Sequence, residues 1–514
     1  MSFSQRLVVI ALMALMVVGI IFIGERENQE EEENEKNAYY QVESVYLWYT
    51  DEDFTDFFTN AAVEFHELYP EIRVIPTLVN SAEYLENINE ASLSNDSFPD
   101  VYMLTNDSIE KAYLSGLASN VRDSEGVLNQ AHFGTGALSA VTYDGNYVGY
   151  PLSYETTVLL YNRTYLQNYV DKLNTEGVSD IDADAGADSL SDEDLAEYLE
   201  DMENVGDASA ETVTEEKTYT LEEFIPETFD DIIEFANVYE ASDGVEAILK
   251  WDVSDIFYNY LFVGNYMIVG GDAGDDTGNI SICNTDSVTC MKVYQNLNSV
   301  FSIDADSSDY DSMLKDFLDG KFVYTIVTSD AIKTVNEALD KKQVEIDEAM
   351  AARELALANA EDSEASEGLE GSETSSVAEV EIPVKYDFGY ANIPDLSGDL
   401  KSRSLSVTNA LLVNGYSEKK DAANKVAAFL TTKYAGSVYD RTGRLPAAKD
   451  AHLEGEAFDV FFSEYGDSIP LPKIVETSNL WVQLEIAFTD IWGGEDAEER
   501  LNAFANQISL QIGE

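Results

Sequence analysis

Few residues in this chain are of the kinds that usually carry catalysis. Its three histidines, His66, His132 and His452, are isolated from one another on expected helices or loops. No Gly-x-Ser-x-Gly nucleophile elbow and no phosphate-binding P-loop occurs, so neither acyl transfer nor nucleotide hydrolysis is indicated. Two carboxylates could hydrolyse a glycoside, but they need a fixed separation and one raised pKa, which no sequence pattern shows. We therefore predict no enzyme and no cofactor.

The two cysteines and one acidic loop are the remaining candidates for covalent or metal chemistry. Cys283 and Cys290 could form a small disulfide clip in an oxidising compartment, or remain two buried thiols. They lack the paired spacing of a zinc site. The run 272–279, Asp-Ala-Gly-Asp-Asp-Thr-Gly-Asn, resembles a calcium loop but has no terminal Glu at the required spacing, which favours a glycine turn. The sequence therefore predicts no metal site.

Length and charge bound the class of protein. A chain of 514 residues with 45% hydrophobic residues is longer than one core usually supports, so at least two compact units are expected. Its 99 acidic and 29 basic side chains give a formal net charge of −70. This charge repels phosphate backbones and anionic lipid headgroups, which excludes nucleic acid as an expected partner.

The N-terminus predicts export. Residues 7–24 are 18 consecutive uncharged residues, close to the lower limit of about 17 for a membrane-spanning helix. Arg6 precedes them and an acidic run, 25–33, follows, so the body is expected outside the membrane. The segment 1–24 has no small-residue cleavage site and no lipid-accepting cysteine, which favours an uncleaved anchor over a cleaved signal peptide. Residues 25–42 read as a solvated acidic tether.

Downstream, strands and helices alternate. Strands are expected at 45–49, 72–75 and 101–104, with helices at 53–69 and 108–116 between and after them. This alternation indicates a mainly parallel sheet covered by helices. Ligands of such sheets bind outside the carboxyl ends of the strands. The candidate ligand-binding residues there are Trp48, Asp51, Asp53 and Asp107.

A second informative stretch runs from Tyr143 to Asn162. Asp144-Gly145 is the turn of a two-residue hairpin, and Val158-Leu-Leu-Tyr161 is a buried strand. Between them, Pro151, Tyr154 and Glu155 are expected to form a rigid bend that carries an aromatic ring and a carboxylate. On its own this stretch fits either an ordinary meander or a hinge between two lobes.

Two regions are too polar to build a core. Residues 171–217 are dominated by Asp, Glu, Ala, Ser and Gly, with at most a short helix near 191–203. A helix expected over 335–360 leads into a second such region, so that the second insertion spans about 342–380. We expect both to be mobile surface insertions.

Several motifs then occur in a recognisable order. They are Phe98-Pro-Asp-Val-Tyr-Met-Leu-Thr-Asn-Asp107, Tyr113-Leu-Ser-Gly-Leu117, Asp144-Gly-Asn-Tyr-Val-Gly-Tyr-Pro151, Leu160-Tyr-Asn162, Pro226-Glu-Thr-Phe-Asp-Asp-Ile-Ile233, Phe317-Leu-Asp-Gly-Lys-Phe-Val-Tyr-Thr-Ile326 and Thr442-Gly-Arg-Leu-Pro446. Together they resemble the extracellular solute-binding proteins of ABC importers, the family that includes maltose-binding protein. Outside the tether and the insertions, the resemblance covers most of residues 43–514.

The resemblance implies a two-lobed periplasmic-binding-protein-like fold of type II. Each lobe would be an α/β unit with a mainly parallel sheet flanked by helices, here preceded by an N-terminal transmembrane helix. Lobe 1 would hold 43–152 with 409–446, and lobe 2 would hold 153–408 with 447–514. Three crossings are implied, near 152–154, near 407–412 and near 444–447, and they add Thr408 and Arg444 to the candidate site.

The resemblance also assigns roles to cleft residues. Asp107 and Glu155 match positions that accept sugar hydroxyls, and Trp481, Phe257 and Tyr260 match aromatic positions that stack on sugar rings. The alternatives are that the aromatic residues belong to the core and that Asp107 caps a helix. Asp330 stands where the maltose binder has a stacking tryptophan, which implies a different ligand.

The expected function follows from these roles. The protein would capture a carbohydrate, in first place an oligosaccharide, between its lobes and deliver it to permease subunits of an ABC importer at the outer face of the cell membrane. A cationic solute such as a polyamine or amino sugar is the alternative, and a glycoside-acting enzyme ranks third. We expect a monomer.

Overall fold

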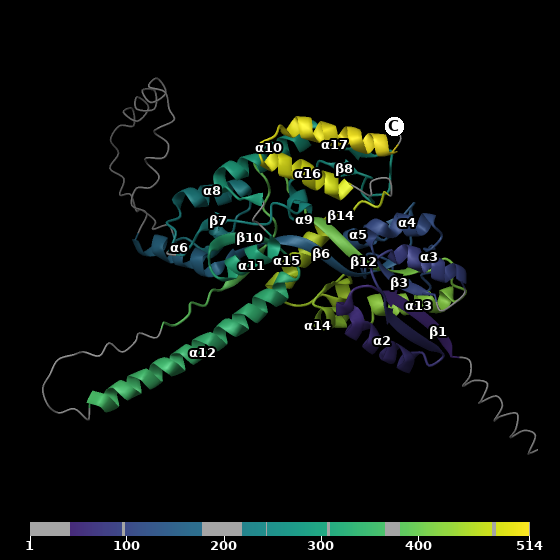
Figure 1. Cartoon of the computed structure of the whole chain (residues 1–514), viewed down its shortest axis with the longest axis horizontal. Helices are drawn as coiled ribbons and strands as arrows, with labels where there is room; N and C mark the ends of the chain where they lie inside the picture. Colours follow the sequence, from purple (N-terminus) through teal and green to yellow (C-terminus); the bar gives the residue numbers. More distant parts are fainter. Residues whose placement is uncertain are drawn as a thin grey trace, which may run out of the picture. The chain divides into compact units, whose positions relative to one another are not determined.

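The computed structural model describes residues 42–94, 98–176, 218–242, 244–305, 309–364, 381–474 and 480–512. The chain divides into two compact units, whose elements are labelled in Figure 1. Of the described residues, unit 1 comprises those up to 134, 141–153 and 409–451, and unit 2 comprises 135–140, 154–408 and 452 onward. Two strands, β6 (Gly149–Asn162) and β12 (Leu405–Val413), contribute residues to both units.

Unit 1 is built on a short, largely parallel sheet. Strand β1 (Glu43–Tyr49) pairs in parallel with β2 (Ile72–Leu78) and β3 (Val101–Thr105), and β12 pairs with β3 in the antiparallel sense. Alternate residues of β1 are buried, and helix α2 (Thr55–Leu68) buries one apolar face. The other elements are η1 (Glu52–Phe54), α3 (Tyr84–Ser94), η2 (Asn106–Ser108), α4 (Ile109–Leu114), β4 (Thr142–Tyr143), β5 (Asn146–Tyr147), α13 (Lys420–Thr431), η6 (Ala435–Ser437), α14 (Val438–Thr442), β13 (Leu445–Pro446) and η7 (Lys449–Ala451).

Unit 2 has a mixed sheet and a larger core. Strand β10 (Phe322–Thr328) is parallel to β7 (Ala247–Leu249), but β6 is antiparallel to both β10 and β11 (Phe388–Ala391). The expectation of a mainly parallel sheet is therefore wrong for this unit, because β6 enters it from the opposite end. The helices are α5 (Thr135–Ala140), α6 (Arg163–Glu176), η3 (Leu221–Phe224), α8 (Phe229–Val238), α9 (Ile256–Asn259), η4 (Tyr260–Phe262), α10 (Thr285–Phe301), α11 (Tyr310–Leu318), α12 (Ala331–Glu364), α15 (Glu456–Asp467), α16 (Leu480–Trp492) and α17 (Ala497–Ile512), and the short strands are β8 (Ile268–Val269), β9 (Ile280–Ser281) and β14 (Ile469–Pro470).

Of two features predicted between Tyr143 and Asn162, the hairpin turn is confirmed and the bend at Pro151 is not found. Asp144 and Gly145 both adopt positive φ, 46° and 71°, and they join β4 to β5 as a two-residue hairpin requires. The bend expected at Pro151 is absent, because β6 is a continuous strand of 14 residues. Proline removes one backbone donor, but its fixed φ is compatible with extended backbone.

The predicted anchor and most of the first insertion lie outside the described residues. None of the described helices is both long and apolar enough to cross a membrane. Residues 1–24 lie outside the residues on which this finding rests. The short helix expected near 191–203 is likewise not covered. In the second insertion, the expected helix over 335–360 is confirmed by α12, which has 34 residues.

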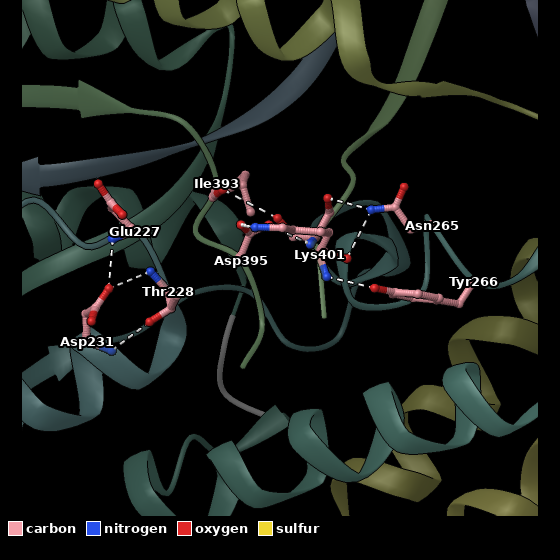
Figure 2. A network of polar contacts seen from close by, with 9 residues as sticks. Glu227, Thr228, Asp231, Asn265, Tyr266, Ile393, Asp395 and Lys401 are labelled. Atoms are coloured by element: carbon pink, nitrogen blue, oxygen red, sulfur yellow. Dashed lines mark hydrogen bonds and ion pairs between the residues drawn. The ribbon is translucent and has the colours of Figure 1, made fainter. Parts of the chain in front are cut away.

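The loop 392–404, which leads into β12, is held by a network of polar contacts (Figure 2). Asp395 accepts hydrogen bonds from Lys401 Nζ at 2.5 Å and from the Ser402 backbone N–H at 3.2 Å. The Lys401 backbone N–H donates to Tyr266 Oη at 2.8 Å, and Asn265 Nδ2 donates to the carbonyl of Lys401 at 3.1 Å. The loop is therefore closed on itself through Asp395 and tied to the segment 265–266 of unit 2.

Candidate functional site

In unit 1, several predicted residues meet at one edge of the sheet. Strands β1 and β3 are parallel, so their carboxyl ends lie at the same edge. Asp51 caps η1 by accepting the backbone N–H of Asp53 at 3.0 Å. The Arg444 guanidinium lies 3.6 Å from the carboxylate of Asp51 and 3.8 Å from that of Asp53. The structure therefore brings these three predicted residues together.

A cavity of about 330 Å³ opens at the ends of β1 and β3. Most of its polar groups are hydroxyls and carboxylates, and the lining also has one amide and one ammonium group. The lining residues are Thr50, Ser81, Glu83, Tyr84, Leu85, Glu86, Met103, Leu104, Thr105, Ser108, Lys111 and Asn409. The sequence predicted the strand ends as the region, but none of these lining residues was among the predicted contacts.

Asp107 and Trp48 lie beside this cavity's walls. The Asp107 carboxylate accepts hydrogen bonds from Thr105 Oγ1 at 2.6 Å and Ser108 Oγ at 3.4 Å. It is not the cap of α4, whose N-cap residue is Ser108 without a side-chain capping bond. Trp48 is half-buried against the core of unit 1, and its carbonyl accepts the Tyr84 hydroxyl at 3.0 Å.

In unit 2, strand pairing gathers carboxylates at one edge. Thr157 of β6 is paired with Thr328 of β10, so Glu155 and Asp330 each lie two residues beyond this pair at the same end. Strand β7 is parallel to β10 and leads to Asp255 at the same edge. Because β6 runs in the opposite direction, its beginning meets the ends of the other two strands.

A stacked pair of tyrosines occupies this edge. Tyr258 and Tyr310 have ring centroids 5.0 Å apart and planes inclined by 20°. The Asp330 carboxylate accepts hydrogen bonds from the Tyr310 hydroxyl at 2.9 Å and from Thr328 Oγ1. Burial raises the pKa of Tyr258, and the negative charges of Asp330, Glu155 and Asp255 raise it further. Glu155 and the two aspartates are therefore close enough to act on one ring.

Two further carboxylates belong to the same region. Burial, and then the charge of Asp252, raise the pKa of Asp255. Burial raises the pKa of Glu485 too, with added contributions from Asp255 and Asp252. No local pattern marks Glu485 or Tyr310, since each reaches this region from a helix distant in the sequence. Tyr258 lies between Phe257 and Tyr260, the two aromatic residues that the resemblance assigned to the site.

Of the three aromatic residues predicted to stack on a sugar ring, two are half-buried and one lies in the core. Phe257 is half-buried and packs edge-on against Tyr258, with centroids 6.0 Å apart. Trp481 is half-buried and meets Tyr260 at 5.9 Å and 66°. Tyr260 itself is only 1% exposed and belongs to the core of unit 2, as the core alternative had it.

Tyr154 and Thr408 also lie in the interior of unit 2. Tyr154 stacks face to face on Tyr465, with centroids 3.8 Å apart and planes within 4°. Thr408 Oγ1 and Tyr465 Oη are hydrogen-bonded at 2.9 Å. Tyr465 therefore links the two strands β6 and β12 at positions that sequence reasoning had treated as ligand contacts.

The possible disulfide is not formed. Cys283 and Cys290 are both free. Cys283 precedes α10 and its Sγ lies 3.9 Å from the carbonyl of Glu498 on α17, whereas Cys290 is buried on α10 itself. The two thiols thus have different surroundings. In the nearby acidic loop, Gly270, Gly271 and Gly274 have positive φ, and no group of three or more His, Cys, Asp or Glu residues within the described ranges could hold a metal ion.

A larger cavity of about 710 Å³ in unit 2 contains none of the predicted site residues. It lies between the segments 222–227, 391–395, 402–404 and 460–467. Glu464 in its wall accepts the backbone N–H of Ile393 at 2.8 Å and Ser404 Oγ at 3.1 Å. Burial raises the pKa of Glu464 to about 7.

Comparison with known proteins identifies the family. Residues 60–459 match the model of the bacterial extracellular solute-binding proteins. The chain belongs to this family. It is therefore a solute-binding protein of an ABC import system, and the family's description places it outside the cytoplasm, as the sequence motifs predicted.

Solved structures agree with this solute-binding protein in fold. An extracellular solute-binding protein from Staphylococcus aureus, in complex with maltose, has a TM-score of 0.65 at 17% identity, over 91% of this chain and 97% of that one. A maltose-binding periplasmic protein from Listeria monocytogenes, also with maltose, has a TM-score of 0.60 at 18% identity, over 92% and 98%. A Streptococcus pneumoniae protein in complex with maltopentaose has a TM-score of 0.57 at 18% identity, over 91% and 99%. No curated protein matches the sequence.

Proposed function

We propose that this solute-binding protein captures a carbohydrate, in first place an oligosaccharide, and delivers it to permease subunits of its importer without chemical conversion. The observation that carries the proposal is the cavity of about 330 Å³ at the strand ends of unit 1. Its hydroxyls, amide and carboxylates can donate to and accept from the hydroxyls of a sugar. The solved structures of similar fold in complex with maltose and maltopentaose support the same class of solute.

Unit 2 also offers proposed contacts. We propose Glu155 and Asp255 as acceptors of sugar hydroxyls, and Phe257 and Trp481 as the half-buried aromatic faces that contact a sugar ring. In unit 1, Trp48, Asp51, Asp53, Asp107 and Arg444 remain proposed contacts. Tyr154, Tyr260 and Thr408 would act by holding the surrounding backbone.

A second candidate solute is a cation such as a polyamine or an amino sugar. The favouring observation is that Glu155, Asp255 and Asp330 all act on Tyr258, and that Asp255 in turn raises the pKa of Glu485. Carboxylates that raise one another's pKa favour a positive charge among them. The Asp330 carboxylate, however, already accepts hydrogen bonds from two hydroxyl groups of the protein. A sugar hydroxyl would make the same kind of bond, so this observation suits a site for hydroxyl groups.

Titration calorimetry on the full-length protein tests these proposals with maltose, maltotetraose, glucosamine and spermidine. We expect heat of binding with maltotetraose, and a weakening of about tenfold or more in Glu155→Ala, because one charge-assisted hydrogen bond is lost. The matched control is Glu337→Ala, an exposed carboxylate on α12, which should leave the affinity unchanged. Binding of spermidine but of no sugar would establish the second candidate instead, and release of glucose from maltotetraose would refute binding without catalysis.

We also propose that residues 1–24 anchor the protein in the membrane, with 25–42 as the tether, so that the protein stays near its permease. Anchoring raises the effective concentration of the binding protein at the transporter. The measurement is the intact mass of the protein recovered from the membrane fraction. A mass lacking the first two dozen residues would show cleavage and refute the anchor.

A further inference from the structure

Three residues other than glycine have a left-handed backbone within the described parts of the chain: Glu83, Asp144 and Ser302, with φ of 53°, 46° and 51°. Two of them have a local reason. Asp144 lies in the two-residue hairpin turn, and Ser302 is the C-cap of α10, where this conformation is common. Glu83 occupies neither kind of position. It lies between β2 and α3, directly before the first residue of α3.

Glutamate is an unfavourable choice at position 83. A residue with a Cβ atom is strained at positive φ, and only Gly, Asn and Asp adopt it readily. The segment is nevertheless fixed on both sides of Ala82, whose N–H donates to Asn80 Oδ1 at 2.8 Å and whose carbonyl accepts Asn87 Nδ2 at 3.0 Å. The Glu83 carbonyl accepts the backbone N–H of Asn87 at 2.8 Å. The surrounding hydrogen bonds therefore hold Glu83 in a conformation that the residue itself disfavours.

Glu83 lines the cavity of unit 1. The other two charged side chains of the lining, Glu86 and Lys111, form an ion pair of 2.8 Å with each other. The Glu83 side chain is exposed and has no hydrogen bond or ion pair to another described residue. Its carboxylate is thus the charged acceptor that the cavity can offer to a solute, beside the hydroxyls of Thr50 and Ser81.

We propose that Glu83 is a solute-contacting residue that determines affinity and specificity in unit 1, by accepting a hydrogen bond from a hydroxyl of the bound carbohydrate. The strained backbone is maintained because it places this carboxylate at the cavity. Strained conformations that the surrounding structure enforces are characteristic of functional positions. This inference rests on the proposed function, since it takes a polyhydroxylated solute as the donor.

The test compares Glu83→Gln, Glu83→Gly and the matched variant Ser302→Gly in the full-length protein. Glu83→Gln keeps the size and the backbone strain but loses the charge, and it should weaken maltotetraose binding about tenfold. Glu83→Gly removes the carboxylate and the strain together, so it should bind at least as weakly and yet unfold at a higher urea concentration than the wild type. Ser302→Gly relieves the same kind of strain at the exposed C-cap of α10, outside the cavity lining, and it should gain stability with unchanged affinity.

The outcomes separate the two proposals. Wild-type affinity for maltotetraose in both Glu83 variants overturns the role of Glu83 and leaves the carbohydrate proposal standing. Failure of the wild type to bind any sugar in the calorimeter overturns both. Loss of affinity together with loss of stability in Glu83→Gly also overturns the role of Glu83, because it would mean that the residue supports the fold.

Discussion

The buried carboxyl of Glu464 gives the stability of this protein a specific dependence on pH. In the folded chain burial raises its pKa from the ordinary 4.5 to about 7, so the folded state binds this proton more tightly than the unfolded state does. The contribution of the group to stability is complete below about pH 4.5, declines as the pH rises, and is lost above about pH 7. We predict that Glu464→Gln, which cannot ionise, abolishes this decline.

The magnitude follows from the pKa. Each tenfold difference in proton affinity between the two states is worth about 1.36 kcal/mol. A rise from 4.5 to about 7 therefore corresponds to about 3 kcal/mol of unfolding free energy. In the wild type the N–H of Ile393 and the hydroxyl of Ser404 donate to the two carboxylate oxygens and stabilise the charged form. The glutamine carbonyl can still accept the N–H of Ile393, and its amide nitrogen can donate to the Ser404 hydroxyl oxygen. From low to neutral pH, the free energy of unfolding of Glu464→Gln should thus rise by about 3 kcal/mol relative to that of the wild type.

Urea denaturation, followed by tryptophan fluorescence at intervals from about pH 5 to about pH 8, measures this difference. The free energy of unfolding of the variant minus that of the wild type should rise steadily with pH. The control is Glu454→Gln, an exposed carboxylate just before α15, whose difference from the wild type should stay constant. A difference for Glu464→Gln that is equally flat, or that falls with pH, would refute the assignment of a raised pKa to this carboxyl.

Two further predictions concern a buried carboxylate and the thiols. Asp100 is 1% exposed and accepts hydrogen bonds from the Tyr46 N–H and from Ser417 Oγ. Asp100→Ala should cost about 2–3 kcal/mol in urea denaturation, because it leaves these two donors without their acceptor; a loss below about 1 kcal/mol would contradict this. Alkylation without reductant should modify both cysteines in the unfolded protein but spare Cys290 in the native one, because burial raises the pKa of that thiol to about 12. A protein that takes up alkyl groups only after reduction would show a disulfide.

The parts of the fold that depend on neighbours in the chain were predictable. The Asp144-Gly145 hairpin follows from turn chemistry, and the long helix α12 follows from helical periodicity, because both are decided within a few residues. The continuity of β6 through Pro151 was not predictable, since the partners that extend the strand come from distant parts of the chain. The same holds for the antiparallel entry of β6 into the sheet of unit 2.

For the candidate site, the strand-end rule located the region but not every residue. It indicated the ends of β1 and β3, where the structure has a cavity, yet Glu83 and Ser81 come from the segment after β2. The rings of Tyr154 and Tyr260 fit a binding role by type, but whether an aromatic ring faces solvent or the core depends on tertiary packing. Glu485 and Tyr310 approach from separate helices, and no local pattern marks such convergence.

The start of α12 changes how the carboxylates of unit 2 act on a solute. The Asp330 carbonyl accepts the backbone N–H of Thr334 at 3.3 Å, so this residue stands at the N-terminus of a helix of 34 residues, about 51 Å long. Figure 1 shows α12 running outward from the rest of unit 2. The aligned peptide dipoles place a partial positive charge of about half an elementary charge at that end. The macrodipole thus offsets part of the charge of Asp330, so a neutral solute meets less negative potential there than a count of carboxylates implies.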